Sequence, residues 1–161
     1  MHLNLRALLD TIAVTEGTST HPKTKHDGYD VIVTGLDGIP EVFTDYTTHP
    51  FANGRRGKVF NRKGLRSTAS GRYQFLVKHW DHYRRQLRLV DFGPGSQDKW
   101  AIQLIKERKA MSDIENGFIK PAIMKISNIW ASLPGAGYGQ HEFTMEKVIE
   151  IYKSKGGHVA G

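Results

Sequence analysis

The chain contains no cysteine and no long hydrophobic run. The absence of cysteine excludes disulfide bonds and thiolate metal ligands, so stability must come from packing, which suits assembly in a reducing cytoplasm. In the first fifteen residues Arg6 and Asp10 interrupt the apolar positions, and no stretch approaches the length of a membrane span. We therefore expect neither a secretory signal peptide nor stable insertion into a membrane.

The composition excludes disordered and fibrous classes of protein. Apolar residues make up 39% and charged residues 24% of the 161 positions, and the sequence shows no low-complexity tract and no internal repeat. A chain of this length buries enough surface to form one sizeable core. We therefore predict a single domain over residues 1–161.

Basic residues outnumber acidic residues by 23 to 16, which gives a net charge of +7. They gather in residues 55–66, 78–88 and 106–109. Such charge draws a protein to any polyanion, whether nucleic acid, an anionic membrane face or a bacterial cell wall. A basic nucleic-acid-binding module is therefore an alternative, although no predicted helix places Lys and Arg together with base-reading residues on one face.

Hydrophobic periodicity predicts an α+β protein that is mostly helical, with one small antiparallel sheet. β-branched and aromatic residues at 29–33 and 41–46, separated by turn residues, predict a β-hairpin, and a third short strand is expected near residues 58–60. Apolar residues at helical spacing predict helices over residues 3–15, 72–89, 96–109 and 121–130, and residues typical of helix ends predict further helices over 112–116 and 144–155.

Several helix ends carry residues typical of caps. Gly17 is placed to end the first helix, and Ser96 and Thr144 are placed to cap the helices that follow them. Ser112 and Glu115 have the spacing of a capping box. These positions predict where the chain turns into and out of its helices.

Glu16 is the candidate catalytic residue. It follows Ile12 by four residues and Leu8 by eight, so it projects from the face that the first helix buries. Burial and the negative end of the helix dipole both raise the pKa of a carboxyl group. A carboxylic acid that stays protonated near neutral pH can donate a proton to a departing glycosidic oxygen. The alternative is an ordinary helix-end glutamate whose side chain turns to water.

A Ser/Thr/Gly turn in residues 67–75, STASGRYQF, runs into the helix predicted from residue 72. Free backbone N–H groups at a helix start, together with Ser70 and Gln74, suit the amide and hydroxyl groups of a sugar. Capping of the helix by Ser70 is the alternative explanation, and the two roles are compatible.

Residues 127–140, SNIWASLPGAGYGQ, place Asn128 and Trp130 before a glycine-rich loop that carries Tyr138. Aromatic rings suit the apolar faces of pyranose sugars, and glycine lets the backbone approach a ligand closely. We assign Trp130 to the core and take Tyr138, which lies between two glycines, as the candidate ligand contact.

The segment HWDH carries His79, Asp81 and His82 on one predicted helix. Histidines three residues apart on a helix can share a metal ion, but no third ligand is evident nearby. We therefore interpret the segment as a solvated helix face and expect no metal and no other cofactor.

The motifs described above belong to a longer series of segments, spread over about residues 8–157, that resembles one known family. The segments are, in order, VTEGT, HDGYDVIVTG, FTDYTTHP, LRSTASGRYQF, WDHYRRQL, DFGPGSQD, IKER and SNIWASLPGAGYGQ. This series resembles the family of the bacteriophage lambda endolysin, lysozyme-like enzymes that degrade bacterial peptidoglycan.

The resemblance implies a lysozyme-like fold in which a helical body and a small sheet enclose a glycan-binding groove. It implies a lytic transglycosylase that cleaves the β-1,4 bond between N-acetylmuramic acid and N-acetylglucosamine and leaves a 1,6-anhydromuramyl end. Glu16 matches the family's catalytic acid. By the same resemblance, Ser70, Tyr73 and Gln74 match the sugar-binding turn, and Asn128 and Tyr138 belong to the segment that lines the far side of the groove. Asp30 is a further candidate sugar-binding residue.

The family also implies the setting in which the protein works. Its partners are peptidoglycan glycan strands, it acts as a monomer, and it accumulates in the cytoplasm of an infected host. A separate phage protein that permeabilises the membrane then releases it to the cell wall.

Hydrolysis is the alternative within the same class of substrate. A hydrolytic glycosidase needs two carboxyl groups that flank the bond. Asp30 and Asp45, on the predicted hairpin, are the candidates for the second group, and the sequence leaves open whether Asp30 assists the chemistry.

Overall fold

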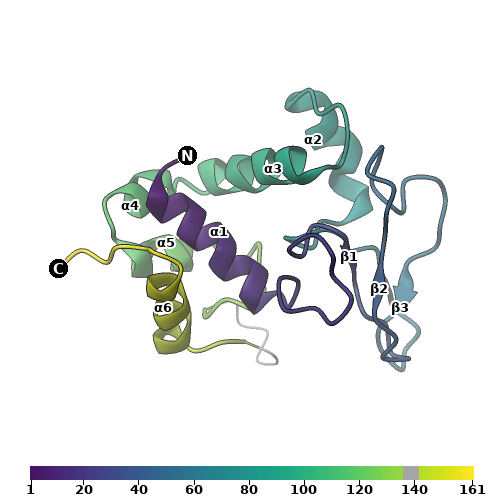
Figure 1. Cartoon of the computed structure of the whole chain (residues 1–161), viewed down its shortest axis with the longest axis horizontal. Helices are drawn as coiled ribbons and strands as arrows, with labels where there is room; N and C mark the ends of the chain where they lie inside the picture. Colours follow the sequence, from purple (N-terminus) through teal and green to yellow (C-terminus); the bar gives the residue numbers. More distant parts are fainter. Residues whose placement is uncertain (136–141) are drawn as a thin grey trace. The chain divides into compact units, whose positions relative to one another are not determined.

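The computed structural model describes residues 1–135 and 142–161. The chain forms two compact units, one made of residues 1–16 and 101–161 and the other of residues 17–100. The first unit is helical, and the second carries the short strands and two short helical segments (Figure 1). Helix α3, Pro94–Glu107, begins in the second unit and ends in the first. A single-domain organisation over residues 1–161 stays a prediction.

Helix α1, Leu3–Thr15, confirms the first predicted helix. Its apolar side chains at helical spacing are fully buried, and Gly17 at φ 75° ends the helix just after its C-cap residue Glu16. α1 packs beside α4, Met111–Glu115, and α6, Met145–Ser154 (Figure 1). The buried amide of Asn4 reinforces this packing, because its Nδ2 donates to the carbonyl of Ile114 at 2.9 Å.

The remaining helices of this unit confirm the predicted elements but not every predicted cap. Thr144 caps α6 as expected, since its Oγ1 accepts the backbone N–H of Lys147 at 3.2 Å. Helix α5, Ile119–Ile126, has Pro121 in its first turn and buries Ile123 and Ile126. The prediction of a capping box for α4 was wrong, because Ala110 is the N-cap and Ser112 lies inside the helix.

The second unit contains two antiparallel hairpins rather than one sheet. β1, Val31–Ile32, pairs with β2, Glu41–Val42, and β3, Lys58–Val59, pairs with β4, Arg66–Ser67. The predicted first hairpin and third strand are therefore confirmed, but each strand has only two residues, and β4 was not predicted. Its sequence mixes charged and small polar residues, so it shows no strand periodicity.

The predicted helix from residue 72 was wrong at its start. Residues 70–75 form a tight turn in which Ser70 and Phe75 exchange backbone hydrogen bonds of 3.0 and 2.8 Å. Within the turn Gly71 and Gln74 have φ values of 85° and 56°, which a right-handed helix does not allow. Helical structure begins only with the 3₁₀ turn η1, Val77–His79, followed by α2, Trp80–Gln86. Ser70 therefore caps no helix.

Ser96 does not cap α3 either, because the helix begins two residues earlier at Pro94. Proline suits the first turn, where its missing N–H would have no helical partner. The hydroxyl of Ser96 instead donates to Asp91 Oδ1 at 2.8 Å. Trp100, further along α3, stacks on Phe75 with ring centroids 4.0 Å apart, and this pair forms part of an aromatic core in the second unit.

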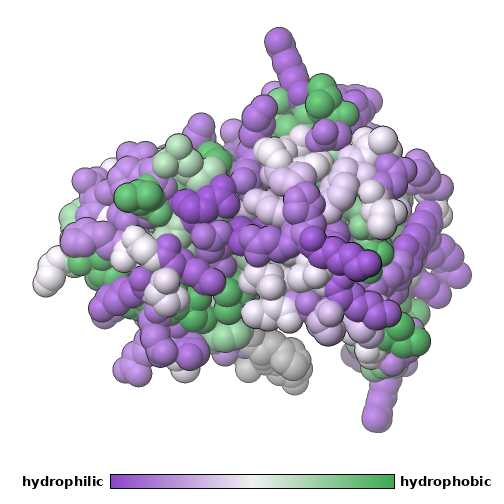
Figure 2. Space-filling model, viewed as in Figure 1, coloured by the Kyte–Doolittle hydropathy of each residue, from purple (hydrophilic) through white to green (hydrophobic). Residues whose placement is uncertain are grey.

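On the face shown in Figure 2, hydrophilic residues cover most of the surface and apolar residues form separate small patches. Within the described parts of the chain, no helix combines the length and the apolar character that crossing a membrane requires.

Candidate active site

Glu16 lies at the C-cap of α1, where its backbone N–H still donates to the carbonyl of Ile12 at 2.8 Å. The residue is half-buried, and the residue before it, Thr15, is buried. The last turn of the helix therefore holds Glu16 at a half-buried position of the helical unit. The prediction that Glu16 projects from the buried side of α1 is consistent with this position.

Ser132 holds the carboxyl group of Glu16. Its hydroxyl donates a short hydrogen bond to Glu16 Oε2 and lies 2.9 Å from the hydroxyl oxygen of Thr15. The backbone N–H of Ser132 also binds the carboxyl group. Ser132 was not among the residues singled out in the sequence, because a lone serine between apolar residues gives no signal of its own.

The pKa of Glu16 is raised above its ordinary value. The main cause is burial, which disfavours the charged carboxylate, and the hydrogen bonds from the side chain and backbone of Ser132 oppose part of the rise. The predicted direction of the pKa shift is therefore confirmed. A raised pKa increases the fraction of Glu16 that carries a proton near neutral pH.

The turn at residues 70–75 contains three of the predicted sugar-binding residues. Ser70 is fully buried, and its hydroxyl donates to the carbonyl of Thr68 at 3.1 Å. Tyr73 is also buried, with its hydroxyl donating to Asp98 Oδ1 at 2.6 Å. Gln74 is half-buried, and its side-chain amide donates to the carbonyl of Gly71 at 3.0 Å. Their role in sugar binding stays a prediction.

The two candidate second carboxylates are already engaged in local hydrogen bonds. Asp30 is buried, and its two oxygens accept from the hydroxyl of Thr24 at 2.5 Å and the backbone N–H of Lys25 at 3.0 Å. Asp45 is exposed and accepts from the backbone and hydroxyl of Thr47. These two hydrogen bonds from Thr47 lower the pKa of Asp45.

The remaining predicted contacts belong to the segment after α5. Asn128 is exposed, and Trp130 is 2% exposed, which confirms the assignment of Trp130 to the core. Tyr138 lies outside the described residues. Asn128 and Tyr138 therefore stay predictions.

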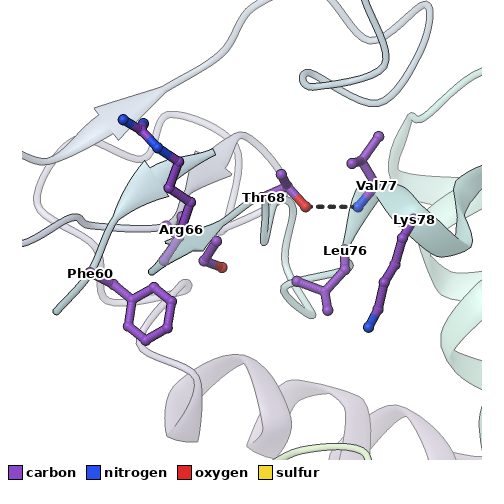
Figure 3. A pocket seen from close by; sticks show the side chains of 8 residues that line it. Phe60, Arg66, Thr68, Leu76, Val77 and Lys78 are labelled. Atoms are coloured by element: carbon purple, nitrogen blue, oxygen red, sulfur yellow. Dashed lines mark hydrogen bonds between the residues drawn. The ribbon is translucent and has the colours of Figure 1, made fainter. Parts of the chain in front are cut away.

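The second unit contains an open pocket of about 600 Å³. Phe60, Leu76 and Lys78 extend to the same side of this pocket, whereas the guanidinium of Arg66 turns away (Figure 3). Thr68 accepts the backbone N–H of Val77 at 3.0 Å (Figure 3). The described lining contains no acidic residue; it consists of Val33, Phe60, Arg66, Ser67, Thr68, Leu76, Val77 and Lys78.

The HWDH segment does not gather metal ligands. His79 is exposed, and the carboxylate of Asp81 forms an ion pair with Arg84 at 3.2 Å. Over residues 1–135 and 142–161, no three His, Cys, Asp or Glu side chains converge in a way that would hold a metal ion. The expected absence of a metal remains a prediction.

Comparison with solved structures defines the class of protein. A structure of bacteriophage lambda lysozyme complexed with a chitohexasaccharide matches with a TM-score of 0.88 and 48% identity, covering 99% of this chain and 98% of the other. A second structure of lysozyme from bacteriophage lambda matches with a TM-score of 0.85, 47% identity and the same coverage. The protein therefore has a lysozyme-like α+β fold.

Sequence comparison narrows this class to one family. The family model described as Endolysin matches residues 6–159, and the chain belongs to this family. The endolysin of Escherichia phage P2 is 62% identical over 156 residues, which covers 97% of this chain and 94% of the relative. The endolysin of Escherichia phage lambda is 51% identical over 155 residues, covering 96% and 92%.

Proposed function

We propose that the protein is a lytic transglycosylase that cleaves the β-1,4 bond between N-acetylmuramic acid and N-acetylglucosamine in bacterial peptidoglycan. The observation that carries this proposal is Glu16, a half-buried carboxylic acid of raised pKa at the end of α1. The lambda lysozyme of similar fold, described in complex with a chitohexasaccharide, supports a glycan as the substrate.

In the proposed reaction Glu16 first acts as the acid and then as the base. It donates its proton to the leaving glycosidic oxygen, while the N-acetyl group of the substrate stabilises positive charge at C1 of muramic acid. The carboxylate of Glu16 then takes the proton of the muramic acid 6-hydroxyl as that oxygen bonds to C1. The internal attack is favoured because the nucleophile belongs to the same sugar and need not be recruited from solution.

The state of the aspartates favours this mechanism over hydrolysis with a second carboxylate. The second carboxylate of a hydrolase must be oriented towards C1 or towards the attacking water. Both oxygens of Asp30 accept hydrogen bonds from its own loop, and Asp45 is exposed and hydrogen-bonded to Thr47. Hydrolysis with Asp30 or Asp45 is the second candidate, because each carboxylate keeps lone pairs that these hydrogen bonds do not use.

Substitution of the acid tests the proposal directly. Glu16→Gln removes the transferable proton but keeps an oxygen that accepts the hydrogen bond from Ser132. We expect the rate of cell-wall clearing to fall at least about a hundredfold, the lower range for loss of a general acid, with unchanged folding by circular dichroism. Substantial lysis by a folded Glu16→Gln protein would contradict the assignment.

The reaction products separate the two mechanisms. Mass spectrometry of digested peptidoglycan should show 1,6-anhydromuramyl ends, which are lighter by one water than the reducing ends made by hydrolysis. Asp30→Asn and Asp45→Asn should leave the chemical nature of these ends unchanged. Reducing ends that disappear in either variant would instead support a hydrolase.

The open pocket of the second unit is proposed as a sugar contact. The ring of Phe60 offers a flat apolar surface for a pyranose, and the ammonium group of Lys78 suits a carboxylate of the muramyl peptide. Phe60 is 46% exposed, so Phe60→Ala should fold normally. We expect it to weaken chitohexaose binding about fivefold in calorimetry, the value of one aromatic contact.

Leu65 provides the matched control for the pocket. It is 54% exposed but is not part of the pocket lining, so Leu65→Ala should leave chitohexaose affinity unchanged. Equal affinity of the Phe60→Ala and wild-type proteins would remove this pocket from the proposed groove.

The wider setting is also a proposal. We infer that a glycan-binding groove accepts the peptidoglycan strand, that the protein works as a monomer without a cofactor, and that it reaches the wall from the host cytoplasm with the help of a separate membrane-permeabilising phage protein. Its membership of the endolysin family, with relatives from two Escherichia phages, supports this setting.

A further inference from the structure

Ser132 occupies a fixed position beside Glu16. Its side chain is 9% exposed, and its carbonyl accepts the backbone N–H of Phe143 at 2.8 Å. The neighbouring residue Leu133 is fully buried and donates its N–H to the carbonyl of Trp130 at 3.0 Å. The peptide group that joins Ser132 to Leu133 is therefore anchored in the helical unit through both its oxygen and its nitrogen.

The hydroxyl of Ser132 is oriented as firmly as its backbone. It bonds to Glu16 Oε2 and lies 2.9 Å from Thr15 Oγ1, which in turn donates to the carbonyl of Ile12 at 3.2 Å. These contacts form a short series of hydroxyl groups from the last turn of α1 to the carboxyl group of Glu16. One carboxyl oxygen of Glu16 is thereby bonded to Ser132 and connected through Ser132 to Thr15.

We propose that Ser132 is a positioning residue, which holds Oε2 of Glu16 so that Oε1 carries the proton transferred to the glycosidic oxygen. This inference rests on the proposed function of Glu16 as the acid. A carboxyl group that rotates freely presents its proton in many directions, whereas a carboxyl group fixed at one oxygen presents it in one. The backbone N–H of Ser132 adds a second restraint that no side-chain substitution removes.

The same contact affects the pKa of the acid. Hydrogen bonds that a carboxylate accepts stabilise its charged form. The two hydrogen bonds from Ser132 therefore lower the pKa of Glu16, whereas burial raises this pKa. Over the described residues, no charged side chain contributes to this shift, whose causes are burial and the two hydrogen bonds from Ser132. Loss of the hydroxyl should therefore raise the pKa of Glu16 further, although it lowers the rate.

Loss of the Ser132 hydroxyl should lower the rate and raise the pKa of Glu16, and this combination tests the proposal. In Ser132→Ala we expect kcat on peptidoglycan to fall about tenfold with little change in KM, and the alkaline limb of the pH profile to move to higher pH. Ser132→Thr keeps the hydroxyl and should recover most of the rate. A loss of structure would lower the rate without moving the alkaline limb in this direction.

Ser127 supplies the matched control. It is 4% exposed, and its hydroxyl donates to the carbonyl of Met124 rather than to Glu16. Ser127→Ala removes a buried serine hydroxyl from the same unit and should leave both kcat and the pH profile as in the wild type. If Ser132→Ala behaves like Ser127→Ala, the positioning role is overturned.

A carboxyl NMR titration of Glu16 separates this inference from the proposed function. The pKa of Glu16 should be higher in Ser132→Ala than in the wild type, whether or not the protein is active. An unchanged pKa would overturn the contact itself. A raised pKa together with unchanged kcat would mean that the contact exists but does not position the proton. Full lysis by Glu16→Gln would instead mean that Glu16 is not the acid.

Discussion

His49 shows how a single buried side chain links the stability of this protein to pH. It is fully buried; its Nε2 lies 2.8 Å from the carbonyl of Phe75, and its Nδ1 accepts the N–H of Phe51 at 3.2 Å. One ring nitrogen acts as a donor to the carbonyl and the other as an acceptor from the N–H, and only the neutral imidazole ring offers both. Burial is the main cause that lowers the pKa of His49 to about 4, and the bond to Phe75 opposes it.

The protein should therefore lose stability as the solution becomes mildly acidic. Between the ordinary histidine pKa of 6.5 and the folded value of about 4, the unfolded chain binds a proton that the folded chain does not. The free energy of unfolding should fall by about 1.4 kcal/mol per pH unit in this range, and this contribution is constant above it. Urea unfolding at pH 7 and at about pH 4.5 measures the difference.

The control for this prediction is His49→Gln, which keeps a side-chain donor for the carbonyl of Phe75 but does not titrate. Its unfolding free energy should depend less on pH over the same range. A wild-type His49 that titrates near its ordinary pKa in NMR would contradict the explanation.

At the scale of the element, some boundaries are set locally and others by distant contacts. Thr144 caps α6 through a residue three positions away, so its role is readable from the sequence. The turn at residues 70–75 instead depends on Gln97, whose Oε1 accepts the N–H of Arg72 at 2.8 Å. A Cβ on Gly71 would lie 2.4 Å from that same oxygen, so only glycine fits there.

Removal of the cap on α6 should have a measurable cost. Thr144→Ala leaves the N–H of Lys147 without its side-chain acceptor, and we expect the free energy of unfolding to fall by about 1 kcal/mol. Thr144→Ser keeps the hydroxyl and should retain most of the stability. Chemical denaturation measures both variants, and equal losses in the two would argue against a capping effect.

At the scale of the whole molecule, the net charge of +7 sets the response to salt. The peptides and polymers of the bacterial wall carry carboxylate or phosphate groups, so a cationic protein concentrates at their surface. Screening shortens the range of this attraction to about 10 Å at 0.1 M salt.

Wall clearing should therefore slow as sodium chloride rises from about 0.02 to 0.3 M. Binding of chitohexaose, which is uncharged, should change little over the same range and serves as the control. Clearing that does not depend on salt would show that the basic surface plays no part in reaching the substrate.

The helices and the candidate acid were predictable because their signals are local. Apolar spacing predicted α1 and α5, and residues typical of helix ends predicted α6. The spacing of Glu16 from Ile12 predicted that its carboxyl group lies on the buried side of α1. The predicted rise in its pKa was confirmed, and its main cause, burial of the carboxyl group, follows from that position.

The sequence by itself determined the mostly helical α+β class, the helix that ends at Glu16, and the cap at Thr144, since each depends on residues within one or two helical turns. Only the tertiary structure decided that Ser132 binds Glu16 across 116 positions, that Gln97 fixes the turn at Arg72, and that β4 pairs with β3. The physical reason is that a hydrogen bond between distant residues leaves no periodic pattern in either of the segments that it joins.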